Sequence, residues 1–150
     1  MQTKTKKQFL ILCASVTILF LFNSCFTCFI SVDSFKQQFA GIDSTALKQV
    51  EIQGFTRFTC LANSLTIIQC VDKKGNPCVL KNKPSIEIRF TYGSNNKKVI
   101  FYFDSVVLIG NNIIGSLSRL IPLIKTIPLN EVSKIEVQDG KKNFKYVVNK

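Results

Sequence analysis

The spacing of apolar residues changes along this chain. From residue 51 onward, apolar side chains recur at every second position, a pattern typical of strands with one buried and one exposed face. Residues 85–92 show it most clearly, with their apolar face made of Ile86, Ile88, Phe90 and Tyr92. Residues 98–109 are largely apolar on both faces, so we expect them to form a central strand.

Turn signals separate the expected strands. The sequence Asp-Lys-Lys-Gly-Asn-Pro at residues 72–77, Gly110-Asn111-Asn112 and Asp139-Gly140 are all typical of tight turns. Further strands are expected at 51–61 (bent at Gly54), 64–71, 78–80, 113–117 and 143–148. Residues 127–138 are expected to form a short strand, a turn around Asn130 and a second strand. We therefore predict a mainly β (α+β) fold, in which residues 51–150 form an antiparallel β-sandwich or barrel of about seven or eight strands.

Residues 25–50 lack this alternation and are expected to be a tether with a short helix. Phe35 and Phe39 are one helical turn apart, and Asp33 is a candidate N-cap, which favours a helix over residues 34–40. A second helical turn is expected after Asp43.

The first residues have the pattern of an export signal. Lys4, Lys6 and Lys7 precede an apolar block over residues 9–22, and no charged residue follows until Asp33. A signal peptide over residues 1–24 would place the rest of the chain outside the cytoplasm.

The end of the leader allows two outcomes. The residues Leu-Phe-Asn-Ser-Cys at 21–25 resemble the relaxed lipobox of lipoproteins from Bacteroidota, although Phe22 and Asn23 depart from its stricter form. This resemblance implies cleavage before Cys25, lipidation of Cys25 and a location on the periplasmic side of the envelope. Alternatively, residues 8–32 remain uncleaved as one membrane-anchor helix, which is long enough to cross a bilayer.

A second resemblance covers residues 98–148. An apolar strand, a hairpin, Ile-Pro-Leu-x-Glu-Val-x-Lys-Ile-Glu-Val from residue 127 and a closing Phe-x-Tyr are similar to small uncharacterised lipoproteins of Bacteroidota. The resemblance implies a small β domain in the cell envelope. It carries no catalytic residue.

Charge and composition narrow the function classes. The net charge is +11, but the lysines stand in turns and singly on strands, so we expect solvated loops and no nucleic-acid partner. The chain has no histidine. That absence excludes Ser-His and Cys-His nucleophile pairs and every metal site that needs imidazole.

Cysteines and one carboxylate are the remaining candidates for chemistry. Cys70 and Cys78 flank the 72–77 turn, so a disulfide between them is one expectation; a Cys60 pairing and unpaired thiols remain open. Cys25-x-x-Cys28 lacks the βαβ context of a redox motif. Asp104 lies within an apolar strand, where we expect a bulge, a strand end or a partner such as Arg89 or Arg119.

These observations predict no catalytic residue, no cofactor and no metal site. We expect a non-enzymatic, membrane-tethered envelope protein that binds another envelope component, protein or glycan. One alternative is an inhibitor or immunity-type protein that blocks a partner enzyme with loop 73–77 or 118–126. Another is contact of the basic surface with anionic lipid head groups.

Overall fold

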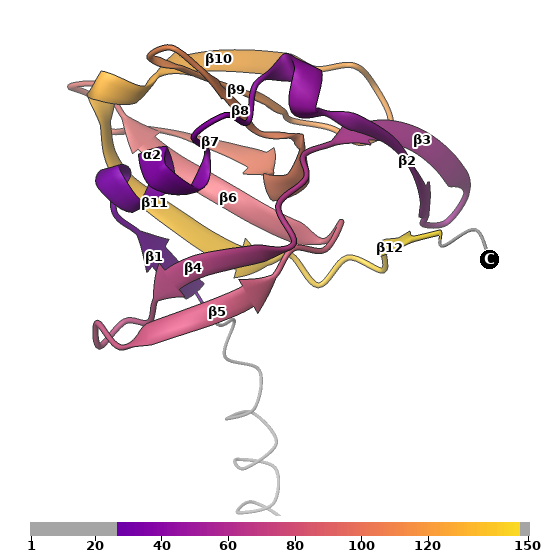
Figure 1. The fold of residues 1–150 in the computed structure, drawn as a ribbon, viewed down its shortest axis with the longest axis horizontal. Helices are drawn as coiled ribbons and strands as arrows, with labels where there is room; N and C mark the ends of the chain where they lie inside the picture. The colour runs from indigo at the N-terminus through magenta and orange to yellow at the C-terminus, as the bar shows by residue number, and fades with distance from the viewer. Residues whose placement is uncertain (1–26, 148–150) are drawn as a thin grey trace, which may run out of the picture.

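The structure is a computed structural model and describes residues 27–147 of the 150-residue chain. Within these residues, twelve strands form three antiparallel sheets, accompanied by one α-helix and three short 3-10 helices (Figure 1). The predicted mainly β, sandwich-like class is confirmed. The strands are more numerous than expected, because two segments predicted as single strands are each divided and residues 27–30 form a strand that was not predicted.

The largest sheet has six strands and the other two have three strands each. In spatial order, the six-stranded sheet contains β5 (Pro77–Lys81), β4 (Ile67–Val71), β1 (Thr27–Ile30), β11 (Val132–Asp139), β6 (Ile86–Tyr92) and β7 (Lys97–Tyr102). The second sheet contains β10 (Ile124–Pro128), β9 (Asn112–Ser116) and β8 (Val107–Ile109). The third contains β12 (Lys145–Tyr146), β2 (Lys48–Gln53) and β3 (Arg57–Ala62).

The helix α2 (Val32–Gln38) packs against the six-stranded sheet. Phe35 and Phe39 stack with ring centroids 4.4 Å apart, and the Phe35 ring meets the ring of Phe90 on β6 edge-on. The expected helix is thus confirmed, but its N-cap is Ser31 rather than Asp33. The Ser31 hydroxyl accepts a hydrogen bond from the backbone of Ser34. The turn after Asp43 is also present, as the 3-10 helix η1 (Ser44–Ala46).

Residues 27–30 differ from their expected role. We assigned them to a tether, or to the end of an anchor helix reaching residue 32, but they form strand β1 in the middle of the six-stranded sheet. The reason is the alternation of buried Cys28 and Ile30 with half-buried Thr27 and Phe29, which fits a place between β4 and β11. The expected signal peptide and Cys25 lie outside the described residues.

Asp104 divides the expected central strand over residues 98–109. Strand β7 ends at Tyr102, the 3-10 helix η2 (Phe103–Ser105) follows, and β8 begins in a different sheet. In addition, β7 lies at the edge of the six-stranded sheet, so the prediction of a central strand was wrong. A second sheet packs over Phe101 on one face of this edge strand, while Ile100 on the other face is exposed.

That packing is close. An added Cβ on Gly115 of β9 would lie 2.5 Å from Cγ of Phe101 on β7, which is too close for any side chain. Glycine at this position therefore allows the second sheet to approach the first.

Two turn predictions need correction. The segment 51–61 is not one bent strand: it belongs to a hairpin in which β2 and β3 pair on either side of Gly54. Asp139-Gly140 is not a hairpin turn, because the chain leaves the six-stranded sheet there and β12 pairs with β2. The Gly140 backbone N–H donates to the Ser85 carbonyl instead. The Gly110-Asn111 turn between β8 and β9 is confirmed.

Within residues 27–147, no helix has both the length and the hydropathy needed to span a bilayer.

Candidate functional site

An apolar groove of about 520 Å³ runs between β3 and the second sheet. Its apolar lining consists of Leu47, Leu61, Val107, Ile109, Ile114, Leu120, Ile121, Pro122 and Ile124. Several serines, Thr59, Cys60 and Arg119 supply its polar atoms. A concave, mainly apolar site with few polar groups is a common form of binding site.

The loop after β9 makes one wall of the groove. Leu120 and Ile121 of this loop, and Ile124 at the start of β10, are 74%, 59% and 67% exposed, an unusual concentration of large apolar side chains in water. These three side chains therefore do not belong to the buried core of the domain.

Behind the groove lies a buried ion pair. The Arg119 guanidinium donates to Asp104 Oδ1 at 2.6 Å and to the Pro84 carbonyl at 2.7 Å, while the Tyr146 hydroxyl donates to Asp104 Oδ2 at 2.6 Å. Arg119 also stacks over the ring of Tyr102. Of the two partners expected for Asp104, Arg119 is therefore confirmed.

The electrostatics of Asp104 reflect its burial. Desolvation raises the pKa of this carboxyl above its ordinary value, while Arg119 and Tyr146 act in the opposite direction. Burial and the neighbouring Asp104 charge also raise the pKa of the Tyr146 hydroxyl. Asp104 has no solvent exposure, and its ion pair with Arg119 ties the loop that carries Arg119 to the interior.

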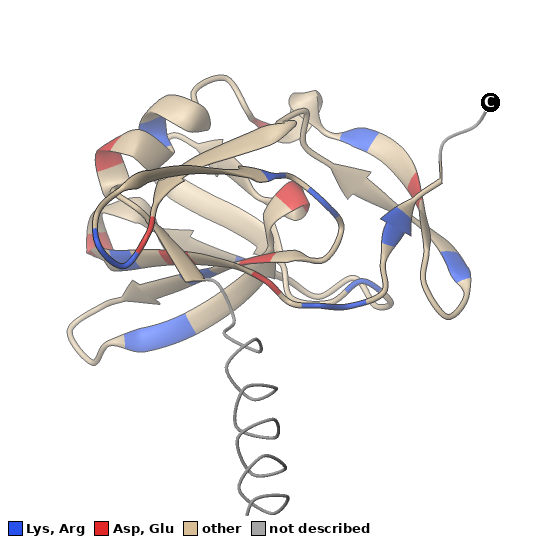
Figure 2. Ribbon diagram, turned by 90° about the horizontal axis from the view of Figure 1, so that it is seen from below, with Lys and Arg blue, Asp and Glu red and all other residues tan. Residues whose placement is uncertain are grey.

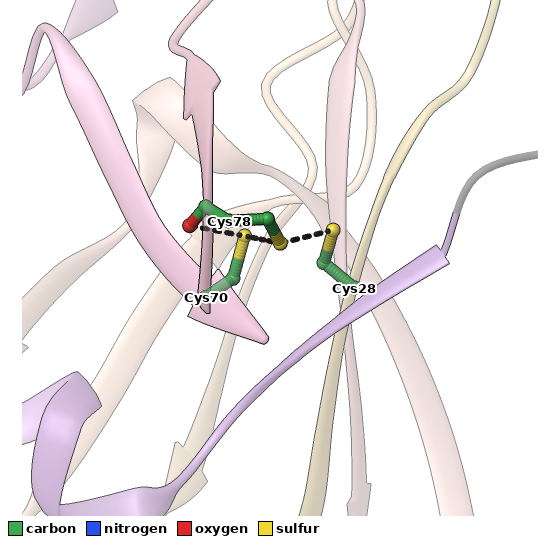
Figure 3. A group of neighbouring side chains, drawn as sticks. All are labelled: Cys28, Cys70 and Cys78. Carbon is green, nitrogen blue, oxygen red and sulfur yellow. Dashed lines mark hydrogen bonds between the residues drawn. The ribbon is translucent and has the colours of Figure 1, made fainter. Parts of the chain in front are cut away.

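A second candidate site is a group of three cysteines at one end of the six-stranded sheet. Cys28 on β1, Cys70 on β4 and Cys78 on β5 direct their sulfur atoms toward one another (Figure 3). Cys78 Sγ lies 3.0 Å from Cys70 Sγ and 3.1 Å from Cys28 Sγ, and all three atoms lie within 4.8 Å of one another.

The three thiols are shielded from water to different degrees. Cys28 and Cys70 are buried and Cys78 is half-buried. Burial, followed by the contact with Cys78, raises the pKa of the Cys28 thiol to about 11. The same two causes raise the pKa of Cys70 further. Both are protonated thiols at neutral pH and poor nucleophiles in this state.

The expected disulfide between Cys70 and Cys78 stays a prediction. The two residues are direct partners across β4 and β5, but their thiols are free. Sequence reasoning missed Cys28, because we considered it only as part of the leader. The sequence offers no clear signal here, because Cys28, Phe29 and Ile30 are all apolar and continue the apolar character of the leader. The other candidate, Cys60, lies apart from this group, with its sulfur 3.5 Å from Arg119 Nη1.

Charged residues do not gather at either place. Figure 2 shows lysines and arginines spread over several strands and turns, interspersed with carboxylates. Ion pairs such as Lys142–Glu87 and Arg89–Glu136 tie some of them to the sheet.

Comparison of this chain with known protein families, with curated proteins and with solved structures finds no match.

Proposed function

We propose that this chain is a membrane-tethered, non-enzymatic protein of the cell envelope whose groove binds an extended apolar segment of another envelope protein. The observation that carries the proposal is the groove beside β3, with the exposed side chains of Leu120, Ile121 and Ile124 on its wall.

The edge of β3 favours an extended protein segment as the occupant. Among residues 27–147, β3 pairs with β2 alone, and its other edge borders the groove through Thr59, Cys60 and Leu61. An added strand would satisfy the free backbone groups of this edge. Its alternate side chains would then enter the apolar groove, which gives such a segment both affinity and selectivity.

The tether follows from the leader and from the lipobox resemblance at residues 21–25. Lipidation of Cys25 would hold the domain on the periplasmic side of a membrane, facing its partner. Intact mass of protein purified from membranes tests this part. We expect an acylated chain beginning at residue 25, and Cys25→Ala to abolish it; an unchanged full-length mass contradicts the lipoprotein assignment.

Site-specific cross-linking tests the groove. A photo-reactive amino acid at Ile121 should yield a covalent adduct in intact cells, and mass spectrometry should map it to an extended apolar segment of an envelope protein. Val79 on β5 is the matched control, since it is 62% exposed against 59% for Ile121 and lies outside the groove. An adduct with lipid alone, or equal yields from both positions, contradicts the proposal.

The exposed loop also favours a second function, that of an inhibitor or immunity-type protein. Leu120 and Ile121 protrude enough to enter the cleft of a partner enzyme. In that case the cross-linked partner is an enzyme, and one equivalent of this protein abolishes its turnover. Ile121→Asp should restore the turnover, whereas Val79→Asp should not.

A further inference from the structure

We propose that Cys28, Cys70 and Cys78 form a three-thiolate binding site for a single thiophilic metal ion of the d10 class, such as Cu(I) or Zn(II). This site is independent of the groove, because its residues come from β1, β4 and β5 (Figure 3).

The arrangement of the sulfur atoms is triangular. A linear arrangement of Cys28, Cys78 and Cys70 would place the outer two sulfurs more than 6 Å apart, given the two contacts of 3.0 and 3.1 Å, but they lie within 4.8 Å. Exchange of a disulfide among the three thiols needs a nearly linear approach of the attacking sulfur. A triangle suits three bonds to one central ion instead.

The ion fits after a small adjustment. A metal–sulfur bond of about 2.3 Å requires sulfurs about 4 Å apart around the ion. Cys78 Sγ must therefore retreat by about 1 Å from both partners. Cys78 is the half-buried member on the short strand β5, so rotation of its side chain toward solvent can provide this space.

The chemistry of the donors selects the class of ion. Thiolates are soft ligands that favour Cu(I) and Zn(II) over Mg(II) or Ca(II). No carboxylate or imidazole joins the three sulfurs in the part of the chain that the structure describes, and the whole sequence lacks histidine. Three thiolates complete a trigonal Cu(I) site; Zn(II) requires water as a fourth ligand, which only the Cys78 side can admit.

Binding is an exchange of protons for metal without electron transfer. Each of the three thiols releases its proton to solvent as its sulfur bonds to the ion, and the oxidation state of the metal is unchanged. The bound ion joins β1 to the β4–β5 hairpin, so it closes one end of the sheet.

Titration with Cd(II), a spectroscopic substitute for these ions, tests the site. The protein is the reduced full chain in detergent, with Cys13, Cys25 and Cys60 replaced by serine so that three thiols remain. We expect sulfur-to-cadmium charge-transfer absorbance that saturates at one ion per chain. A thiol reagent should then detect three thiols in the metal-free denatured protein and none in the native complex.

Removal of one ligand provides the decisive comparison. Cys28→Ser in this background should weaken Cd(II) binding by more than about 100-fold. Loss of a residue that only contacts a metal ligand weakens metal binding by at most about this factor. Because Cys28 is buried, Cys78→Ser serves as a second variant that disturbs packing least. Binding by either variant as tight as that of the parent, or no saturation in the parent, overturns the proposal.

Direct titration of the metal-free protein identifies the ion. Saturation by Zn(II) at one ion per chain indicates the four-coordinate site with water, and saturation by Cu(I) alone indicates the trigonal site. Failure of both ions to bind overturns the assignment to Cu(I) or Zn(II).

Discussion

At the scale of single residues, Asp104 decides where the chain changes from one sheet to another. Its carboxylate is satisfied by Arg119 and by the Tyr146 hydroxyl, so a strand that would otherwise continue ends here and η2 forms. Loss of one partner of a buried ion pair leaves an uncompensated charge. The loop that carries Arg119 is therefore anchored by a group that never contacts the groove.

The Tyr146 hydroxyl can be removed with little change in shape. We expect Tyr146→Phe to lower the free energy of unfolding by about 1–2 kcal/mol at pH 7, because a hydrogen bond to a charged group is lost. Tyr92→Phe is the control, since it leaves the Asp104 contacts intact. Chemical denaturation of both variants measures the difference.

The pH dependence of this effect has a definite sign. Burial raises the pKa of Asp104 in the folded protein above its ordinary value of 3.8, so its contribution to stability is complete below about pH 4 and is lost as the pH rises through the folded pKa. Tyr146→Phe removes a contact that lowers the pKa of Asp104. The variant therefore loses more stability than the parent protein as the pH rises. The difference in free energy of unfolding between the parent protein and the variant should thus be smaller at pH 4 than at pH 7. A difference that shrinks as the pH rises contradicts this account.

Gly115 sets the distance between two sheets. We expect Gly115→Ala to lower the free energy of unfolding by about 1–3 kcal/mol, because the new methyl group overlaps the ring of Phe101. Phe101→Leu in the same chain should recover part of this loss by making room. A double-mutant cycle with no coupling between the two sites contradicts the assigned cause.

At the scale of elements, α2 contacts a part of β4 that β1 is too short to pair with. β1 pairs with β4 at Phe29 and Val71. Farther along β4, the side-chain amide of Gln38 donates to the Gln69 carbonyl at 2.9 Å and accepts from the Gln69 N–H at 2.8 Å. One side chain thus takes the place of a missing strand residue and fixes α2 to the sheet.

Because of this contact, we expect substitutions of Gln38 and of Gln37 to lower the stability by different amounts. Gln38→Ala should lower the free energy of unfolding by about 1–2 kcal/mol. The substitution removes the two hydrogen bonds between the Gln38 amide and the backbone of Gln69, at a site that water can partly reach. Gln37→Ala, on the exposed side of the same helix, should change it by less than about 0.5 kcal/mol. Equal effects in thermal denaturation would show that the amide contact does not hold the helix.

The elements that could be predicted are those whose local pattern agrees with their surroundings. Residues 85–92 alternate cleanly and form β6, and Phe35 and Phe39 identify α2. For residues 98–109, a strand end at Asp104 and Arg119 as its partner were both among the alternatives, but the local pattern could not choose between them because position 119 is distant in sequence. The cysteine cluster was missed for the same reason: its members come from three strands, and one of them follows an apolar leader directly.

At the scale of the whole molecule, the domain begins within two residues of Cys25. Strand β1 starts at Thr27, so a lipid on Cys25 would hold the sheet directly at the membrane surface with almost no spacer. Under the proposed lipidation, the groove and the cysteine cluster would have a restricted orientation relative to the bilayer.

Truncation of the chain measures how much strand β1 contributes to stability. We expect a chain that begins at residue 25 to unfold cooperatively, and a chain that begins at residue 31 to lose this transition, because it lacks a strand with neighbours on both sides. Circular dichroism during heating of the two proteins distinguishes them. A cooperative transition in the shorter chain would show that β1 is dispensable.

The position of β1 also sets the order of events during synthesis. Thr27 pairs with Gln138, so the sheet cannot close until nearly the whole chain has been made. Such distant pairing makes folding slow. If the leader acts as the proposed export signal, the chain would therefore reach the export machinery unfolded, in a form that can be threaded through a narrow channel.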